Sequence, residues 1–458
     1  MCALYSSSDQ PWVLITLSKT IDAYLSVEDM VINRNKQRFT PVVDVLDPSF
    51  DSYQGERGDK GKEEADLSQR KPVLGGVTDP GKSEAHEELS SCSLLLARKQ
   101  YDTVQDLDWP HRIFMKLGTE REAVICMAVS PDGRYIASCF EDKSIRIWSL
   151  ESDTLAYRLT DPDEDCDTIF SVAWSHDSTK LISGNNNSNA TIWLVESDTD
   201  EIVVPAHVLI GHNADVQAVA MSPNGLKAAT GSVNGSVKLW NVETEVAYIS
   251  IEDLGGIVSR VTFSPNGKRL AVAADVGASV YDTDNGMHLV ELQGHRGLIW
   301  SLSFSSNGEH LVTGSEDHTA RVWKTDSGDE PVVIQEHSGP VWSAMFSPDD
   351  KEVLTGSYDS LVAVCDSLTG RNRLQLKDSR SIVNVAAYTP DGDYVVAGYA
   401  NGAIKIWRNA NGEFVCEIQG HKDRVKNLDF TPDGGKIVSS GDDGTVRVWD
   451  LLDIIRLA

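Results

Sequence analysis

Apolar and polar positions alternate over short segments of the chain, and the pattern of segments repeats. One copy reads IWSLSF at 299–304, HLVTGS at 310–315 and TARVW at 319–323, with turn residues between the segments. Alternation with a period of two residues is typical of strands whose two faces meet different surroundings. A further short apolar run follows before the next copy starts. Each copy therefore predicts four short antiparallel strands.

Two kinds of turn residue mark every copy. A turn of the form Ser/Thr-Pro-Asp/Asn-Gly, such as SPNG at 222–225, recurs in eight places, and SHDS at 175–178 is one degraded form. Successive turns lie 41 to 47 residues apart. An Asp or Asn also precedes the closing residue of each copy by six positions, as Asp317 precedes Trp323. A period of about 40–45 residues with four strands per copy is typical of propeller blades.

Eight copies fit between residues 111 and 458. We therefore predict an all-β propeller of eight four-stranded blades, because stacking in a ring covers both faces of each blade and protects its edges. Too few residues follow Trp449 to form an outer strand, so HRIFMKLG at 111–118 is expected to complete the eighth blade. The alternative is seven blades, with the second or fourth copy displaced.

The Gly-His pairs at 211–212, 294–295 and 420–421, with the Asp/Asn turns and the closing tryptophans, resemble the WD-repeat beta-propeller family. The resemblance implies a buried hydrogen-bonded network of His, Ser/Thr, Asp and Trp in each blade. The residues of this sequence at such positions are His212, His295, Asp317, Trp323, His337, Asp359, His421, Asp443 and Trp449. Several copies depart from the pattern, and we expect blades two and four to be the softest in hydrogen exchange.

Residues 1–110 do not repeat, and we expect them to form an acidic, mostly disordered extension before a propeller over 111–458. Within the extension, apolar positions between 17 and 31 approximate one helical face, which predicts a short helix. The alternative is a docking segment over 12–46 that orders on a partner or on the propeller flank.

Composition narrows the classes of function. The chain has 41 basic and 69 acidic side chains and a net charge of −28, and such a field repels phosphate backbones, so direct nucleic-acid binding is not expected. Its seven cysteines form no Cys-x-x-Cys pair, which favours a reducing compartment. We recognise no signal peptide and no apolar run long enough for a membrane span. We therefore expect a cytoplasmic or nuclear protein that is not secreted.

No P-loop, G-x-S-x-G or H-E-x-x-H string occurs in the sequence. The histidines at recurring positions are explained by the network that the family resemblance implies. We therefore expect neither an enzyme nor a cofactor, a metal ion or a small-molecule substrate.

Binding residues gather on loops at one end of a rigid scaffold, and the family resemblance implies partners at the top face and the mouth of the central channel. In each copy one candidate position enters the innermost strand and another precedes the Asp/Asn of the turn. The residues predicted to contact a partner are Phe170, Trp300, Glu316, Trp342, Tyr358, Lys426 and Asp442.

Three of these aromatics, Trp300, Trp342 and Tyr358, belong to adjacent copies five and six, and aromatics are enriched at binding hot spots. We expect the partner to be a peptide or loop that carries a basic residue. Glu316 and Asp442 would face the charge of this residue, and Tyr358 would stack on it. The alternative is that the two tryptophans only pack between strands.

The predicted function is a non-enzymatic scaffold or adaptor that assembles a multiprotein complex through the propeller top face. The alternative is a substrate-recognition subunit of a ubiquitin ligase, although no copy has the Trp-Asp-x-Arg string that docks cullin-4-type adaptors. A third class is the sensor half of a stress or immunity protein, whose repeat arrays contain similar strings.

Overall fold

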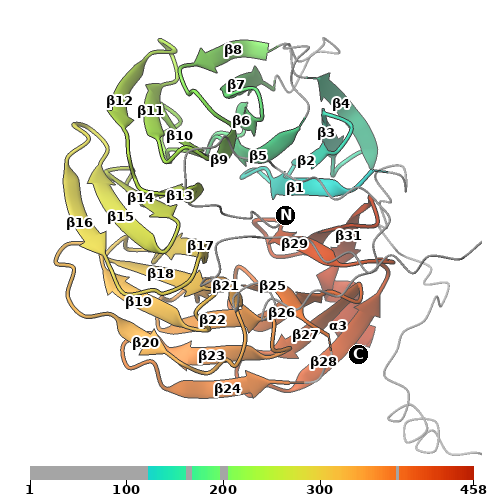
Figure 1. The fold of residues 1–458 in the computed structure, drawn as a ribbon. Coiled ribbons are helices and arrows are strands. Elements are labelled where there is room, and N and C mark those ends of the chain that lie inside the picture. The colour runs from blue at the N-terminus through green and yellow to red at the C-terminus, as the bar shows by residue number, and fades with distance from the viewer. Residues whose placement is uncertain (1–121, 161–167, 196–204, 378–380, 458) are drawn as a thin grey trace, which may run out of the picture. The chain divides into compact units, whose positions relative to one another are not determined.

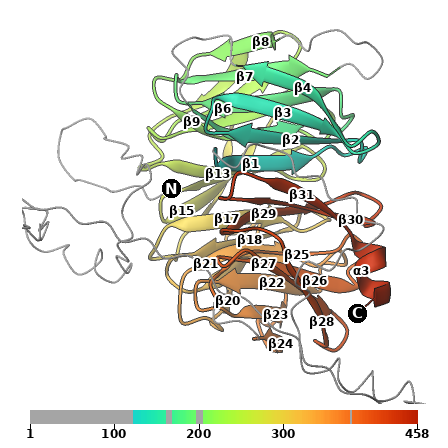
Figure 2. The same cartoon turned by 90° about the vertical axis from the view of Figure 1, so that its right-hand side faces the viewer.

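The computed structural model describes residues 122–160, 168–195, 205–377 and 381–457. These residues form eight antiparallel sheets, one for each repeat copy, which we number as blades one to eight in chain order. Figure 1 shows the sheets following one another around a ring, and Figure 2 shows the same ring turned by 90°. The prediction of eight blades is confirmed, and the seven-blade alternative is wrong because the fourth copy forms a sheet of its own.

Within each blade the strands follow chain order from the centre of the ring outward. Blade one consists of β1 (Val124–Val129), β2 (Tyr135–Phe140), β3 (Ser144–Ser149) and β4 (Thr154–Thr160), and blade two of β5 (Ile169–Trp174), β6 (Lys180–Asn185), β7 (Asn189–Leu194) and β8 (Pro205–Ile210). Blade three consists of β9 (Val216–Met221), β10 (Lys227–Ser232), β11 (Val237–Asn241) and β12 (Ala247–Ile251), and blade four of β13 (Val258–Phe263), β14 (Arg269–Ala274), β15 (Gly277–Asp282) and β16 (His288–Leu292).

The second half of the ring repeats this order. Blade five consists of β17 (Ile299–Phe304), β18 (His310–Ser315), β19 (Ala320–Lys324) and β20 (Val332–Ile334), and blade six of β21 (Val341–Phe346), β22 (Glu352–Ser357), β23 (Val362–Asp366) and β24 (Asn372–Leu376). Blade seven consists of β25 (Val383–Tyr388), β26 (Tyr394–Tyr399), β27 (Ala403–Arg408) and β28 (Phe414–Gln419), and blade eight of β29 (Val425–Phe430), β30 (Lys436–Gly441) and β31 (Val446–Asp450).

The chain after β31 forms a helix, α3 (Leu451–Leu457). Leu451 and Ile454 of α3 pack in one apolar cluster with Trp449 of blade eight and Ile418 of blade seven. Within the described residues the eighth sheet has three strands. The segment 111–118 predicted to complete it, the helix predicted at 17–31, the docking segment 12–46 and the extension 1–110 lie outside the described residues.

The ring closes between its first and last blades. Val124 and Phe140 of blade one share an apolar cluster with Val438 and Val446 of blade eight. The side chain of Asp429 in β29 accepts a hydrogen bond from the backbone N–H of Val129 in β1, with 3.0 Å between the nitrogen and Oδ2. Closure buries the faces of blades one and eight that would otherwise lack a neighbouring blade, as the propeller prediction requires.

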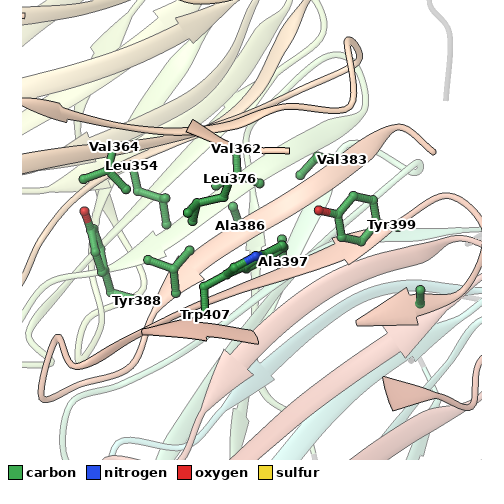
Figure 3. Close-up of a cluster of buried hydrophobic side chains, with 12 residues drawn as sticks. Leu354, Val362, Val364, Leu376, Val383, Ala386, Tyr388, Ala397, Tyr399 and Trp407 are labelled. Carbon is green, nitrogen blue, oxygen red and sulfur yellow. The ribbon is translucent and has the colours of Figure 1, made fainter. Parts of the chain in front are cut away.

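The core lies between neighbouring blades. Figure 3 shows one such layer, in which Leu354 and Val362 of blade six pack against Val383 and Trp407 of blade seven. These four side chains are 2% exposed or less. Burying a side chain of this kind stabilises the folded state by about 1.5–3 kcal/mol. Inter-blade packing therefore holds the positions of the loops at the ends of the blades.

Candidate functional site

Each innermost strand starts with a β-bulge. In blade five Ile299 pairs with Ser315 and Ser301 pairs with Gly314, so Trp300 is the extra residue. The same irregularity recurs in all eight blades. The eight bulge residues are Ile125, Phe170, Gln217, Ser259, Trp300, Trp342, Asn384 and Lys426. A bulge re-aims a side chain out of the regular alternation of its strand, and these are the positions at which the chain was predicted to enter the innermost strand.

The second set of predicted positions lies at the same end of the blades. The backbone N–H of Glu316 donates to the carbonyl of Leu298 at 2.9 Å, and the N–H of Tyr358 donates to the carbonyl of Pro340 at 3.0 Å. Leu298 and Pro340 each stand two residues before a bulge residue. We call this end of the ring, formed by the loops into the innermost strands and the turns between second and third strands, the top face.

Blade four differs in its turn. Ala274 pairs directly with Gly277, so the turn holds only Asp275 and Val276. The N–H of Asp275 donates to the carbonyl of Ile257 at 3.1 Å, which is the bond that Glu316 makes in blade five. Asp275 precedes Tyr281 by six positions, as Asp317 precedes Trp323, and the spacing therefore predicts that Asp275 is the blade-four copy of Asp317. This prediction is wrong, because Asp275 corresponds to Glu316.

Trp300 and Trp342 stack on each other across the boundary between blades five and six. Their ring centroids are 5.1 Å apart and the ring planes differ by 11°. Both side chains are partly exposed, while the indole N–H of Trp342 is buried and has no hydrogen-bond acceptor among the described residues. Tyr358, from the same end of blade six, is 40% exposed. The pair packs between blades and also presents aromatic surface on the top face.

The charged candidates are separated around the ring. In blade eight the carboxylate of Asp442 lies 3.0 Å from the ammonium of Lys426 and 3.8 Å from the guanidinium of Arg424. Because these cations already balance its charge, Asp442 is a poor attractor for a basic residue of a partner. Glu316 of blade five accepts a 3.4 Å hydrogen bond from the N–H of Leu298 and forms no ion pair within the described part of the chain.

Phe170 is the bulge residue of blade two and is partly buried. It lies three blades away from the tryptophan stack in the order of the ring. The structure thus brings Trp300, Trp342, Glu316 and Tyr358 to adjacent blades and leaves Phe170 apart from them.

A hydrogen-bonded chain of side chains crosses blade five. The indole N–H of Trp323 donates to the hydroxyl of Thr313 at 2.9 Å, and that hydroxyl lies 2.7 Å from Nε2 of His295. Nδ1 of His295 lies 2.8 Å from Asp317. A carboxylate can only accept, so Nδ1 carries the proton and Nε2 accepts from the threonine. Burial opposes ionisation of Asp317, but hydrogen bonds from His295 and Thr319 outweigh it and lower the pKa of the carboxyl.

Blades three, six and eight contain versions of this chain. Each histidine places Nε2 within 2.6 to 2.8 Å of a hydroxyl. The histidines and their hydroxyl partners are His212 with Thr230, His337 with Thr355 and His421 with Ser439. Asp359 and Asp443 lie beside Nδ1 in blades six and eight, and Trp449 donates to Ser439. Sequence reasoning did not identify the hydroxyl residues, although they lie 18 positions after the histidine in all four blades.

His212 is the histidine without an aspartate, since its Nδ1 lies 2.8 Å from the hydroxyl of Ser236. Burial, together with the charge of Lys238, lowers the pKa of His212 to about 4. The unfolded state, with a pKa near 6.5, therefore binds a proton more readily between pH 6.5 and 4, and stability falls as the pH falls through that window. We expect His212 to contribute a loss of roughly 1–2 kcal/mol between pH 7 and pH 5.

Urea unfolding at both pH values measures this effect. The His212→Gln variant removes the titrating group, so its stability should change less between pH 7 and pH 5 than that of the wild type. An equal change in the two proteins would contradict the assignment.

No helix in the described part of the chain has the length and hydropathy of a membrane span. Among the described residues, no group of three or more His, Cys, Asp or Glu side chains is arranged to hold a metal ion.

Comparison with known proteins follows the same repeat. The family model described as WD domain, G-beta repeat, matches seven segments, which are 114–149, 157–194, 203–241, 286–324, 328–366, 371–408 and 412–450. The interval 242–285 between two matches contains β13, β14 and β15 of blade four. Blade four, which has the shortened turn, is thus also the blade whose first three strands lie outside the matched segments.

The curated relatives share part of the chain. The transcriptional corepressor LEUNIG_HOMOLOG of Arabidopsis thaliana is 28% identical over 42% of this chain and 24% of its own length. Apoptotic protease-activating factor 1 of Rattus norvegicus is 30% identical over 39% of this chain and 14% of its own length. The chain therefore spans a quarter or less of these two relatives.

A solved structure, the C-terminal WD40 domain of Sif2, superimposes with a TM-score of 0.64 at 19% identity, covering 73% of this chain and 97% of that one. At this identity the likeness concerns the fold alone.

Proposed function

The chain belongs to the WD domain, G-beta repeat family, and on that premise we propose that it is a non-enzymatic scaffold or adaptor that assembles a multiprotein complex. WD-repeat propellers are in general protein-interaction domains. The proposed contact surface is the top face of blades five and six, and the proposed place of action is the cytoplasm or nucleus.

The observation that carries this proposal is the tryptophan stack. Trp300 and Trp342 stand at bulges, where their side chains leave the regular ladder, and they remain partly exposed. Tyr358 adds an exposed aromatic at the same end of blade six. Large, rigid aromatics give contact area at low cost in conformational entropy and are enriched among residues that dominate binding energy.

Glu316 gives the surface its charge preference. Its carboxylate is partly exposed and has only the Leu298 N–H as a hydrogen-bond donor within the described residues. A partner segment with a lysine or arginine would pair with Glu316 and lay its alkyl stem or guanidinium plane on the aromatic rings. The proposed partner is therefore a peptide or loop of another protein that carries a basic residue.

Affinity capture of the full chain from its native cells, with mass spectrometry of the recovered proteins, tests the surface. The Trp300→Ala, Trp342→Ala, Tyr358→Ala triple variant should lose the main partners, with at least about a tenfold fall in affinity for each purified partner. Phe170→Ala is the matched control, because it removes an aromatic at the equivalent bulge of blade two. Equal recovery with both variants would reject the proposed surface.

The charge preference has its own variant. Glu316→Arg should weaken the same partners and reduce the salt dependence of binding. Recovery of cullin and adaptor subunits would instead favour the ubiquitin-ligase alternative.

A further inference from the structure

Blade four contains a cavity of about 340 Å³. It lies between the loop that leads into β13, the strand β14 and the outer strands β15 and β16. The lining residues that matter here are Asp253, Val272, Ser279, Tyr281, His288 and Glu291. The volume is at the lower end of the range for small-ligand pockets, about 300–1,000 Å³, which suits one side chain better than a large cofactor.

The cavity stands where other blades hold their hydrogen-bonded chain. Strand register shows the correspondence, because Thr313 of blade five pairs with Arg321 and Val272 of blade four pairs with Ser279. Val272 cannot make the hydrogen bonds of Thr313, and Tyr281 closes the blade in place of a tryptophan. In the loop before β13, Leu254 takes the position of the buried His295, five residues before the bulge residue, and the preceding Asp253 is exposed.

The same register shows that blade four lacks a cation. Five blades have a basic residue two positions before the closing aromatic, and these residues are Arg146, Lys238, Arg321, Lys405 and Arg447. Arg321 and Arg447 lie 5.8 and 6.0 Å from the ring centroids of the closing tryptophans of their own blades. Ser279 occupies this position in blade four, so the place of the cation is open there.

Blade seven shows what the missing cation does. Lys405 pairs across the sheet with Glu417, and its ammonium lies 3.0 Å from that carboxylate. In blade four the equivalent ladder pair is Ser279 with Glu291. Glu291 therefore stands opposite the open position, and its hydrogen-bond partner is the side-chain amide of Gln293 at 2.8 Å.

Two carboxylates and an aromatic wall thus surround the open position. Glu291 and Asp253 form no ion pair in the part of the chain that the structure describes, and the ring of Tyr281 is buried beside them, 5.1 Å from the edge-on ring of His288. A lysine or arginine side chain matches such a site, because its stem packs on the ring while its charged end meets the carboxylates.

We propose that the blade-four cavity binds a single lysine or arginine side chain of a partner protein, which takes the place of the cation that five other blades supply internally. The site stands on residues of blade four alone. It is independent of the tryptophan stack and of whether the top face of blades five and six binds a partner.

Titration of the full chain with Nα-acetyl-arginine amide, followed by calorimetry, tests the site. The expected result is saturable binding of the arginine amide. The neutral isostere Nα-acetyl-citrulline amide should bind with an affinity at least about tenfold lower. Asp253→Asn combined with Glu291→Gln should weaken the arginine amide by a similar factor. No saturable binding, or equal binding of the two amides, would overturn the proposal.

Ser279→Arg locates the site. It restores the internal cation, so it should abolish the binding and raise the melting temperature of the protein. Thr244→Arg adds the same charge at an exposed position of blade three and should leave the binding intact. Binding that survives Ser279→Arg, or that Thr244→Arg abolishes equally, would show that the arginine amide binds elsewhere and would overturn the proposal.

Discussion

Replacing Thr313 with valine should lower the free energy of unfolding by about 3 kcal/mol. The Thr313 hydroxyl accepts from the Trp323 indole and lies within hydrogen-bond distance of His295 Nε2. Valine has nearly the same shape, so the variant leaves a buried donor and a buried acceptor without partners and creates no cavity. Each orphaned group costs about 1–3 kcal/mol. Chemical denaturation with fluorescence of the buried tryptophans measures the change.

The matched control is Thr244→Val, which makes the same substitution at an exposed position. It should change stability by less than about 0.5 kcal/mol. Equal effects of the two variants would mean that the hydrogen bonds of Thr313 contribute nothing. Blade four holds Val272 at the equivalent position without this penalty, because its sequence also lacks the histidine and tryptophan that the hydroxyl would serve.

Gly402→Ala should destabilise the protein by at least about 3 kcal/mol, from two separate causes. Gly402 has φ of 83°, which costs a residue with a side chain about 1–2 kcal/mol. A Cβ at this position would also clash with the carbonyl oxygen of His421, which is backbone of the loop into blade eight. The clash cannot be relieved without moving that loop away from blade seven.

Gly255→Ala separates the two causes. Gly255 has φ of 79°, and a Cβ there would meet nothing within 4 Å. This variant should therefore lose only the conformational part, about 1–2 kcal/mol. Thermal unfolding of the two variants gives the comparison, and a loss for Gly402→Ala no larger than for Gly255→Ala would contradict the assigned clash.

The repeat spacing was enough to predict the ring, because the turn residues of each copy mark the ends of strands whose pairing is local. The same counting misread blade four. Asp275 precedes Tyr281 by six positions, as Asp317 precedes Trp323, yet the turn of blade four is shorter and Asp275 corresponds to Glu316. Spacing along the chain gives the number of residues between two positions. It does not show with which residue of the neighbouring strand each of them pairs.

The positions of the candidate residues on the top face were predictable from the sequence, but the contacts that their side chains make were not. A fixed offset from the proline turn located Trp300 and Trp342, but their stacking joins residues 42 positions apart and depends on the angle between blades. The ion pair of Lys426 with Asp442 likewise forms between two predicted residues and offsets the charge for which Asp442 was chosen. Such contacts depend on side-chain direction, which the bulge sets and the sequence pattern does not specify.

The recurring bulge lets surface side chains vary without a change in the fold. A bulge residue lies outside the ladder that pairs its strand, so its side chain can change while the register on either side stays fixed. The eight bulges already hold residues as different as Trp300, Lys426, Gln217 and Ser259 on one unchanged backbone plan. New specificities could therefore be selected from a library that varies these eight positions together, with the inter-blade core left as it is.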